Sequence, residues 1–152
     1  MTTAVPILTG VLSVACFASM GLVQDAGLRA TLLILGVGFG FVAAGFAWIT
    51  ESQKLRRKAK LGEFLRRAMD LSRECDNEFL DFAVAKKKCD ILEHEEDAYI
   101  LRQFGSAEVA LLNNSQGIVI HLSDRTMTPD RNNYANWCRY RAVRLTEMIG
   151  RL

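Results

Sequence analysis

The first 49 residues of this chain almost lack charged side chains, and only Asp25 and Arg29 carry a charge. Two apolar runs lie on either side of the polar turn Gln24–Gly27. Each run is long enough to cross a bilayer, because a spanning helix needs about 20 predominantly apolar residues. The sequence therefore predicts two transmembrane spans, at about 4–23 and 28–49.

Two other interpretations of an apolar N-terminal segment agree less well with the sequence. Burying two helices that are apolar on every side would need a larger amphipathic shell than about a hundred residues supply. A signal peptide would have a basic stretch before its apolar core and a small-residue cleavage site after it, but Met1-Thr2-Thr3 has no charged side chain. We therefore expect both runs to be retained as spans.

The sequence also lacks the spacings that identify most enzymes and metal sites. It has no GxxxxGK[ST] phosphate loop and no G-x-S-x-G elbow. His94 lies in the acidic stretch Glu93–Asp97, but its neighbour Glu95 points to another helix face, and no second histidine follows four residues later. We interpret the stretch as an exposed acidic helix face and expect no catalytic residue, no cofactor and no metal ion.

The four cysteines form no CxxC pair and are interpreted as buried thiols. Cys16 falls in the first apolar run, and the other three fall in the polar part of the chain. Cys89 or Cys138 could act as a nucleophile in an enzyme of unrecognised type, but nothing singles out His94 or His121 as its base.

Basic residues set the expected orientation. Five cations follow the second run within ten residues, and the turn between the runs has none. Because positive charge stays on the cytoplasmic side, both termini are predicted to be cytoplasmic, at the inner (plasma) membrane. The predicted membrane-interface residues are Trp48, Lys54, Arg56, Arg57, Lys58 and Lys60. The net charge of +2, with no aromatic residue among these cations, argues against a nucleic-acid partner.

Small residues recur every four positions along both apolar runs. Helices in a bilayer associate through such faces, because lipid tails are as apolar as leucine side chains. The runs are therefore predicted to pack as a hairpin, through Gly36, Gly40 and Ala44 of the second run and through Val11, Ala15 and Ser19 of the first. Gly38 and Gly45 lie on another side of the second run, so we expect a homo-oligomer as well.

The remaining residues have helical periodicity. The second span is predicted to continue as one helix to about Cys75, with an apolar or small face of Leu55, Ala59, Gly62, Leu65 and Met69. A second segment, about 78–104, ends at Gly105, which is typical of a C-cap. Its apolar positions are Phe82, Ala85, Cys89, Leu92 and Tyr99.

The C-terminal part contains two further predicted helices. Ser106 is expected to cap a short helix over 107–113. Residues 118–122 are predicted to form either a short strand or an irregular linker. Thr128-Pro129-Asp130 is typical of a helix start, with a capping hydroxyl, proline at the first position and an acid in the first turn. The final helix then continues to Arg151, with an apolar side of Tyr134, Cys138, Leu145, Met148 and Leu152.

Charge alternates along these segments. Residues 51–75 have a net charge of +4, residues 76–112 of −5 and residues 113–152 of +3. Adjacent segments of opposite charge favour a compact antiparallel bundle. The predicted fold is thus all-α, with a two-helix transmembrane hairpin at 1–50 followed by a small cytoplasmic helical bundle at 51–152.

Two functions agree with this layout. The first is a non-enzymatic membrane protein whose hairpin anchors and oligomerises a cytoplasmic helical domain that binds a protein partner. The second is an oligomeric pore or membrane-disrupting effector, similar to holins. In outline the chain is similar to several prokaryotic membrane proteins, some of them phage-defence effectors, but the similarity covers the layout and no motif. The spans lack a charged or strongly polar stripe to line a wet channel, which favours the first function.

Overall fold

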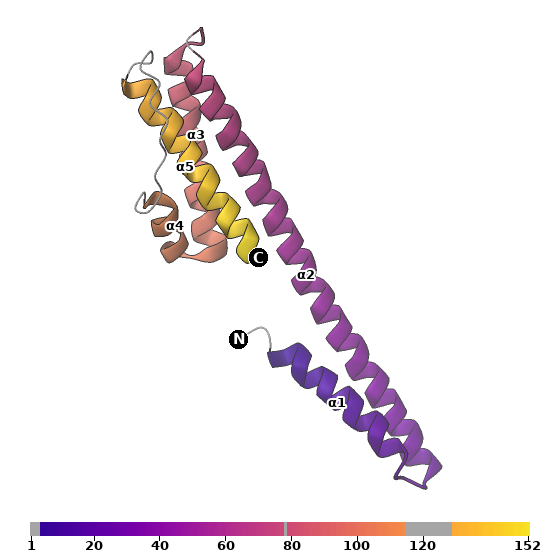
Figure 1. The fold of residues 1–152 in the computed structure, drawn as a ribbon. Coiled ribbons are helices and arrows are strands. Elements are labelled where there is room, and N and C mark those ends of the chain that lie inside the picture. Colours follow the sequence, from indigo (N-terminus) through magenta and orange to yellow (C-terminus); the bar gives the residue numbers. More distant parts are fainter. Residues whose placement is uncertain (1–3, 78, 115–128) are drawn as a thin grey trace. The chain divides into compact units, whose positions relative to one another are not determined.

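The computed structural model describes residues 4–77, 79–114 and 129–152, and within these ranges every element is a helix. The helices are α1 (Ala4–Met20), α2 (Ala26–Asp76), α3 (Phe82–Phe104), α4 (Ser106–Asn113) and α5 (Pro129–Arg151) (Figure 1). The chain divides into two compact units, Met1–Arg56 and Arg57–Leu152. The all-helical prediction is therefore confirmed for the described residues, and the strand or linker predicted at 118–122 lies outside them.

In the first unit α1 lies antiparallel to the N-terminal part of α2 (Figure 1). The Ser13 hydroxyl donates a hydrogen bond of 2.8 Å to the carbonyl oxygen of Gly36. A Cβ atom on Gly36 would lie 3.2 Å from the Phe17 ring, and one on Gly40 would lie 3.4 Å from the Ser13 hydroxyl. Glycine therefore lets the two backbones approach closely, as small residues do between apolar helices.

The predicted packing residues lie only partly at this contact. Gly36 is buried and Gly40 is half-buried against α1, whereas Ala44 and Ala15 are exposed. The Ser19 hydroxyl donates to the carbonyl of Ala15 within its own helix. The face of α1 that meets α2 carries Ser13, Cys16 and Phe17 instead of Val11, Ala15 and Ser19. The reason is that Gly36 has no side chain, which leaves room for the Phe17 ring and lets the Ser13 hydroxyl reach the Gly36 carbonyl.

The helices of the hairpin begin and end at different residues from those predicted. α1 ends at Met20 and not at Val23, and has 17 residues. The Asp25 carboxylate accepts a hydrogen bond of 2.9 Å from the Leu28 amide and so caps α2. By length and composition α2 is able to cross a membrane, whereas the apolar stretch in α1 falls short of that length.

The prediction that the second helix continues without a break is confirmed, because α2 reaches Asp76. The apolar or small face predicted for this stretch is only partly directed inward, since Leu65 packs against the core but other members are exposed. Leu55 is 59% exposed and Met69 is 46% exposed. The buried positions advance by threes and fours from a neighbouring start, at Leu61, Phe64, Ala68, Leu71 and Cys75. This second stripe carries a phenylalanine and two leucines, so its burial removes more apolar surface from water.

Capping decides where the other helices begin and end. α3 begins at Phe82 and not at 78, because the Asp81 carboxylate accepts a hydrogen bond of 2.9 Å from the Ala83 amide. Gly105 ends α3 with φ at 94°, and its amide donates to the carbonyls of Ile100 and Leu101, as predicted for a C-cap glycine. Ser106 is the first residue of α4 and makes no side-chain capping bond, so its predicted cap is wrong.

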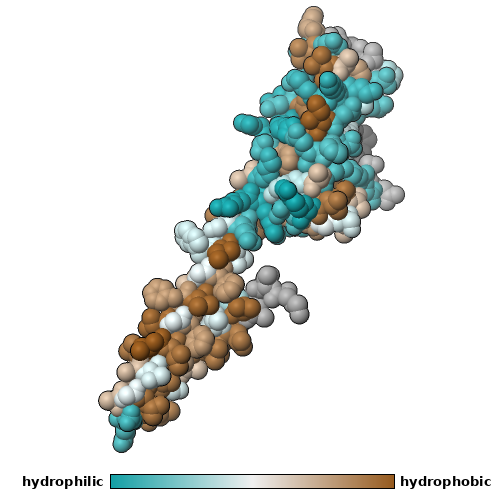
Figure 2. All heavy atoms as spheres, turned by 180° about the vertical axis from the view of Figure 1, so that it is seen from behind, coloured by the Kyte–Doolittle hydropathy of each residue, from teal (hydrophilic) through white to brown (hydrophobic). Residues whose placement is uncertain are grey.

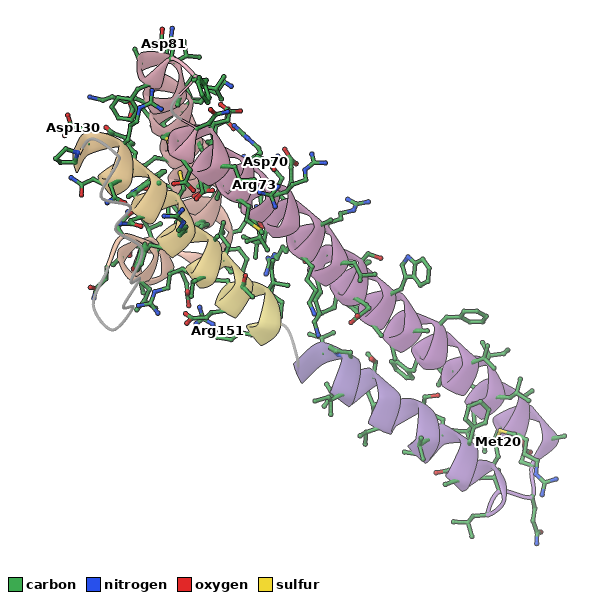
Figure 3. All side chains as sticks on the ribbon, turned by 45° about the horizontal axis from the view of Figure 1, so that its top comes forward. Met20, Asp70, Arg73, Asp81, Asp130 and Arg151 are labelled. Carbon is green, nitrogen blue, oxygen red and sulfur yellow. The ribbon has the colours of Figure 1, made fainter. Side chains whose placement is uncertain are left out.

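The last helix follows the prediction at both ends. α5 has Pro129 at its first position, Asp130 in its first turn and Arg151 at its end (Figure 3). Thr128, the predicted cap, lies outside the described residues. Cys138, Leu145 and Met148 are buried, and Tyr134 and Leu152 pack against the same core.

The second unit has one hydrophobic core, to which all of its helices contribute. α2 supplies the five residues named above, and the other helices supply Ala85, Cys89, Leu92, Ile100, Leu112, Ala135, Cys138, Leu145 and Met148. Phe64 and Tyr99 meet edge to face at 5.6 Å, as do Phe82 and Tyr134. Asp70 and Arg73 lie on the exposed side of α2 (Figure 3).

We expect Gly36→Leu to lower the stability of the hairpin by about 1–3 kcal/mol, because the new side chain would overlap Phe17 and displace the Ser13 hydrogen bond. Gly10→Leu is the matched control, since a Cβ atom on Gly10 meets nothing within 4 Å. Thermal denaturation of both variants in detergent measures the difference. Equal loss of stability in the two variants would contradict the α1–α2 contact.

Candidate functional site

Arg141 is the largest fully buried side chain among the described residues, with no exposed surface. It lies in the apolar stripe of α5, three residues after Cys138 and four before Leu145. A buried guanidinium is costly unless it is paired and hydrogen-bonded. The residues around Arg141 are therefore the first place to look for a site.

Arg141 donates to acceptors on α3 and α4. Its Nε atom lies 2.6 Å from a carboxylate oxygen of Glu96, which is also fully buried. Nη1 lies 2.9 Å from the side-chain oxygen of Asn113, and Nη2 lies 2.5 Å from Asp97. The guanidinium also sits 4.7 Å from the centre of the Trp137 ring, a cation–π contact.

Asn113 completes this network, because its amide donates a hydrogen bond of 3.0 Å to the second carboxylate oxygen of Asp97. Tyr140 directly precedes Arg141, and its hydroxyl donates to the carbonyl of Leu111 at 3.2 Å. We call Arg141, Glu96, Asp97 and Asn113 the arginine network. It holds the C-terminal half of α3, the end of α4 and the middle of α5 in one arrangement.

Glu96 is the member of the arginine network whose pKa is shifted. Burial raises its pKa to about 7, and the adjacent Arg141 charge opposes part of that effect. One oxygen of its carboxylate, Oε1, is buried with no hydrogen-bond partner among the described residues. A carboxyl with this pKa exchanges its proton near neutral pH. The Glu96 side chain is, however, enclosed by the bundle. The network is therefore better suited to holding helices together than to acting on a substrate.

The interpretation of Glu93–Asp97 as an exposed acidic face is therefore wrong for Glu96, although His94 and Glu95 are exposed. The sequence carried a signal that could have located the network. Glu96 follows Ala85, Cys89 and Leu92 at helical spacing, and Arg141 lies in the apolar stripe of the last helix. Opposite charges placed within two apolar stripes indicate a buried ion pair.

Exposed ion pairs surround the bundle and follow the alternation of charge along the chain. Arg67 of α2 meets Glu95 of α3 at 2.5 Å, Arg139 of α5 meets Asp76 of α2, and Arg151 meets Glu108 of α4 at 2.8 Å. One pair runs against that alternation, because Lys88 of the acidic segment meets Glu74 of the basic segment at 2.6 Å. Each such pair contributes only about 0–1 kcal/mol, so they select the pairing of helices more than they stabilise it.

The predicted interface residues lie in different surroundings. Trp48 is 77% exposed and Arg56 is exposed. Arg57 instead stacks over the Phe104 ring at 5.6 Å, and Lys60 pairs with Glu63 at 2.8 Å. Lys54 and Lys58 are half-buried. Two of the six predicted side chains therefore make contacts within the bundle unit.

The cysteines of the bundle unit are buried thiols, as predicted. Cys75, Cys89 and Cys138 are free and lie in the core, and Cys16 of α1 is half-buried. Over the described ranges, no three side chains of histidine, cysteine, aspartate or glutamate are arranged to hold a metal ion. Comparison of the chain with protein-family models, with curated proteins and with solved structures finds no match.

We expect Arg141→Met to lower the free energy of unfolding by about 3–5 kcal/mol at pH 8, because it leaves the Glu96 charge buried and unpaired. The control Arg151→Met removes an exposed pair and should cost about 0–1 kcal/mol. Chemical denaturation in detergent compares the two variants. If Arg141→Met costs no more than the control, the network does not hold the bundle together.

The raised pKa of Glu96 gives stability a pH dependence. The carboxyl binds a proton more tightly in the folded chain, with a pKa of about 7 against an ordinary value of 4.5. Its stabilising contribution is therefore present below about pH 4.5 and is lost as the pH rises to about 7, a difference of about 3 kcal/mol. Denaturation curves between pH 4.5 and 8 should show this decline in the wild type, and Glu96→Gln should lack it. Parallel curves would contradict the shift.

Proposed function

We propose that this protein is an integral membrane protein of a prokaryotic inner membrane. In this proposal the α1–α2 hairpin anchors and oligomerises a cytoplasmic helical domain, which binds a protein partner and catalyses no reaction. The observation that carries the proposal is the apolar surface of the hairpin. The bundle, in contrast, has a largely hydrophilic surface on the face shown in Figure 2.

Apolar side chains of the hairpin point outward around α1 and α2. Val14 is 68% exposed, Ile34 is 69% exposed and Phe41 is 76% exposed. The most apolar stretch of α2 is only 6% buried, whereas the core helix of a water-soluble protein would be mostly buried. A contiguous exposed apolar surface of this kind favours contact with lipid or with another apolar helix.

Backbone carbonyls accept a hydrogen bond from every hydroxyl side chain between residues 4 and 50. Ser13 donates to α2, and the others donate to the preceding turn of their own helices. Those donors are Thr9, Ser19, Thr31 and Thr50, at 2.8–3.0 Å from carbonyls four residues earlier. A lipid environment requires polar groups to form their hydrogen bonds within the protein, because hydrocarbon offers them no partner.

The same hydrogen bonds argue against the alternative, an oligomeric pore or membrane-disrupting effector. A wet channel needs polar groups directed to its lumen, and the hydroxyls of the hairpin are occupied by their own backbone. The charged residues Asp25 and Arg29 lie at the turn, where Arg29 donates to the carbonyl of Val23. No observation in the hairpin favours conduction over anchoring.

Two surfaces are available for assembly and partner binding. Gly38 and Gly45 have open space where a Cβ atom would be, so a second copy of α2 could approach there closely. In the bundle unit, a groove of about 420 Å³ between α2 and α5 combines an apolar floor with a charged rim. It is lined by Leu65, Met69, Ala142 and Val143, with Arg73, Asp76 and Arg139 among the polar residues. This combination resembles the anatomy of protein interfaces.

A charged side chain on the hairpin surface tests whether the hairpin anchors the protein in the membrane. Ile34→Lys should prevent stable membrane integration, because a lysine at mid-span costs about 3 kcal/mol. Leu22→Lys, at a position that is 87% exposed and lies between α1 and α2, should leave integration intact. Alkaline extraction of membranes from expressing cells measures both. If both variants and the wild type are released as soluble protein, the hairpin is not an anchor.

Orientation and assembly are tested on the same protein. A reporter that is active only outside the inner membrane should be inactive when fused after residue 152 and active when fused after residue 27. Gly38→Leu should lower the mass of the detergent-extracted particle without loss of helix, whereas Val37→Leu, at a neighbouring exposed position that already carries a side chain, should not change it. An active reporter at residue 152 would overturn the orientation, and a monomeric wild-type particle would overturn the oligomer.

A further inference from the structure

Three of the four cysteines meet inside the bundle unit, although they are far apart in the sequence. Cys75 comes from the last turns of α2, Cys89 from α3 and Cys138 from α5. Each thiol is buried, with at most 1% of its surface exposed. Cys75 neighbours both of the others closely enough to interact with them electrostatically. We call these three residues the thiol cluster.

Within the cluster, the sulfur atoms of Cys89 and Cys138 lie 3.6 Å apart. A disulfide bond needs about 2.05 Å, so the two sulfurs would have to approach by about 1.5 Å. Each sulfur sits at the end of a single rotatable side-chain bond. The pair is therefore in contact as two thiols and close to the separation at which a covalent bond forms.

A groove gives small molecules a route to this pair. It has a volume of about 250 Å³ and lies between α3 and α5. Cys89 forms part of its wall, together with Asp90, Glu93, Asn133, Tyr134 and Trp137. Cys75 and Cys138 are not among the lining residues, so Cys89 is the member of the cluster that a small molecule in the groove would meet first.

The three thiols of the cluster differ in the direction in which their pKa values are shifted. Hydrogen bonds from Cys138 and Cys89 lower the pKa of the Cys75 thiol, with help from the charges of Arg131 and Arg139. The hydrogen bond to Cys75 in turn raises the pKa of Cys138. Cys138 lowers the pKa of the Cys89 thiol, but Cys75 and burial raise it, to about 12 overall, so Cys89 reacts as a thiol.

We propose that the thiol cluster is a site of reversible oxidation, at which a hydroperoxide converts Cys89 and Cys138 to a disulfide. The Cys89 sulfur attacks the peroxide, and the thiol proton passes to the leaving oxygen. The O–O bond breaks, Cys89 becomes a sulfenic acid, and the alkoxide or hydroxide leaves and is protonated. The Cys138 thiol then attacks the Cys89 sulfur, and water departs.

The two thiols together supply the two electrons that reduce the peroxide, and a thiol reductant reverses the reaction. The new bond would join α3 to α5 across a loop of 49 residues. Cys138 lies one turn before Arg141, so the disulfide would lock the same pair of helices that the arginine network holds. Oxidation would thereby convert a bundle held by noncovalent contacts into one that is covalently closed.

The test treats the full-length protein in detergent with hydrogen peroxide, then denatures it and alkylates the remaining thiols. We expect the number of alkylated cysteines to fall from four to two and to return to four after treatment with dithiothreitol. Trypsin should release peptides 89–102 and 132–139 as one disulfide-linked species. Four reduced thiols under these conditions, or a disulfide that includes Cys75, would overturn the proposal.

Three variants separate the roles of the cysteines. Cys16→Ala, outside the bundle unit, should form the disulfide at the wild-type rate. Cys138→Ala should stop at the sulfenic acid of Cys89, which dimedone traps. Cys75→Ala should still form the disulfide, because Cys75 is outside the bonded pair, and circular dichroism checks that each variant folds. Loss of the disulfide in a folded Cys75→Ala variant would overturn the assignment of the bond to Cys89 and Cys138.

Discussion

The buried pair of Arg141 and Glu96 constrains the bundle unit more than any other contact. Neither side chain has exposed surface, and each would be costly to bury alone. Hydrophobic contacts tolerate small shifts between helices, but a guanidinium with fixed donor directions does not. Its further bonds to Asp97 and Asn113 set the register of α5 against α3 and bring in the end of α4. The surrounding apolar residues supply most of the stability, and the pair selects one arrangement among those that would bury them.

The hairpin unit is built on a different constraint, the close approach of two backbones. Gly36 has no side chain to separate α1 from α2, and the Ser13 hydroxyl uses the carbonyl exposed there. Apolar side chains then face outward, which is the reverse of the bundle unit. Both patterns occur along α2, whose first half exposes apolar residues and whose last turns bury Leu71 and Cys75. Apolar residues are thus exposed in the first half of this helix and buried in its last turns. This difference favours different solvents around the two parts of the helix.

The sequence predicted helices well and their inward faces less well. Along α2, two stripes of apolar or small residues compete, one through Leu65 and Met69 and the other through Phe64 and Leu71. Choosing between them depends on which stripe the neighbouring helices cover, and periodicity alone does not contain that information. The candidate site was missed for a related reason. Glu96 lies among four other polar residues, so its local surroundings are typical of an exposed face, and its partner Arg141 is 45 residues away.

The sequence by itself determined what depends on near neighbours in the chain. The polar turn between the apolar runs, the C-cap at Gly105 and the start at Pro129 follow from local hydrogen bonding and backbone freedom. Only the tertiary structure decided which side chains lose contact with water. It buried Glu96 with Arg141, gathered Cys75, Cys89 and Cys138 from three helices, and turned Ser13 instead of Ala15 toward α2. These choices depend on packing between distant segments, where many weak contacts are satisfied together and no short stretch of sequence specifies the result.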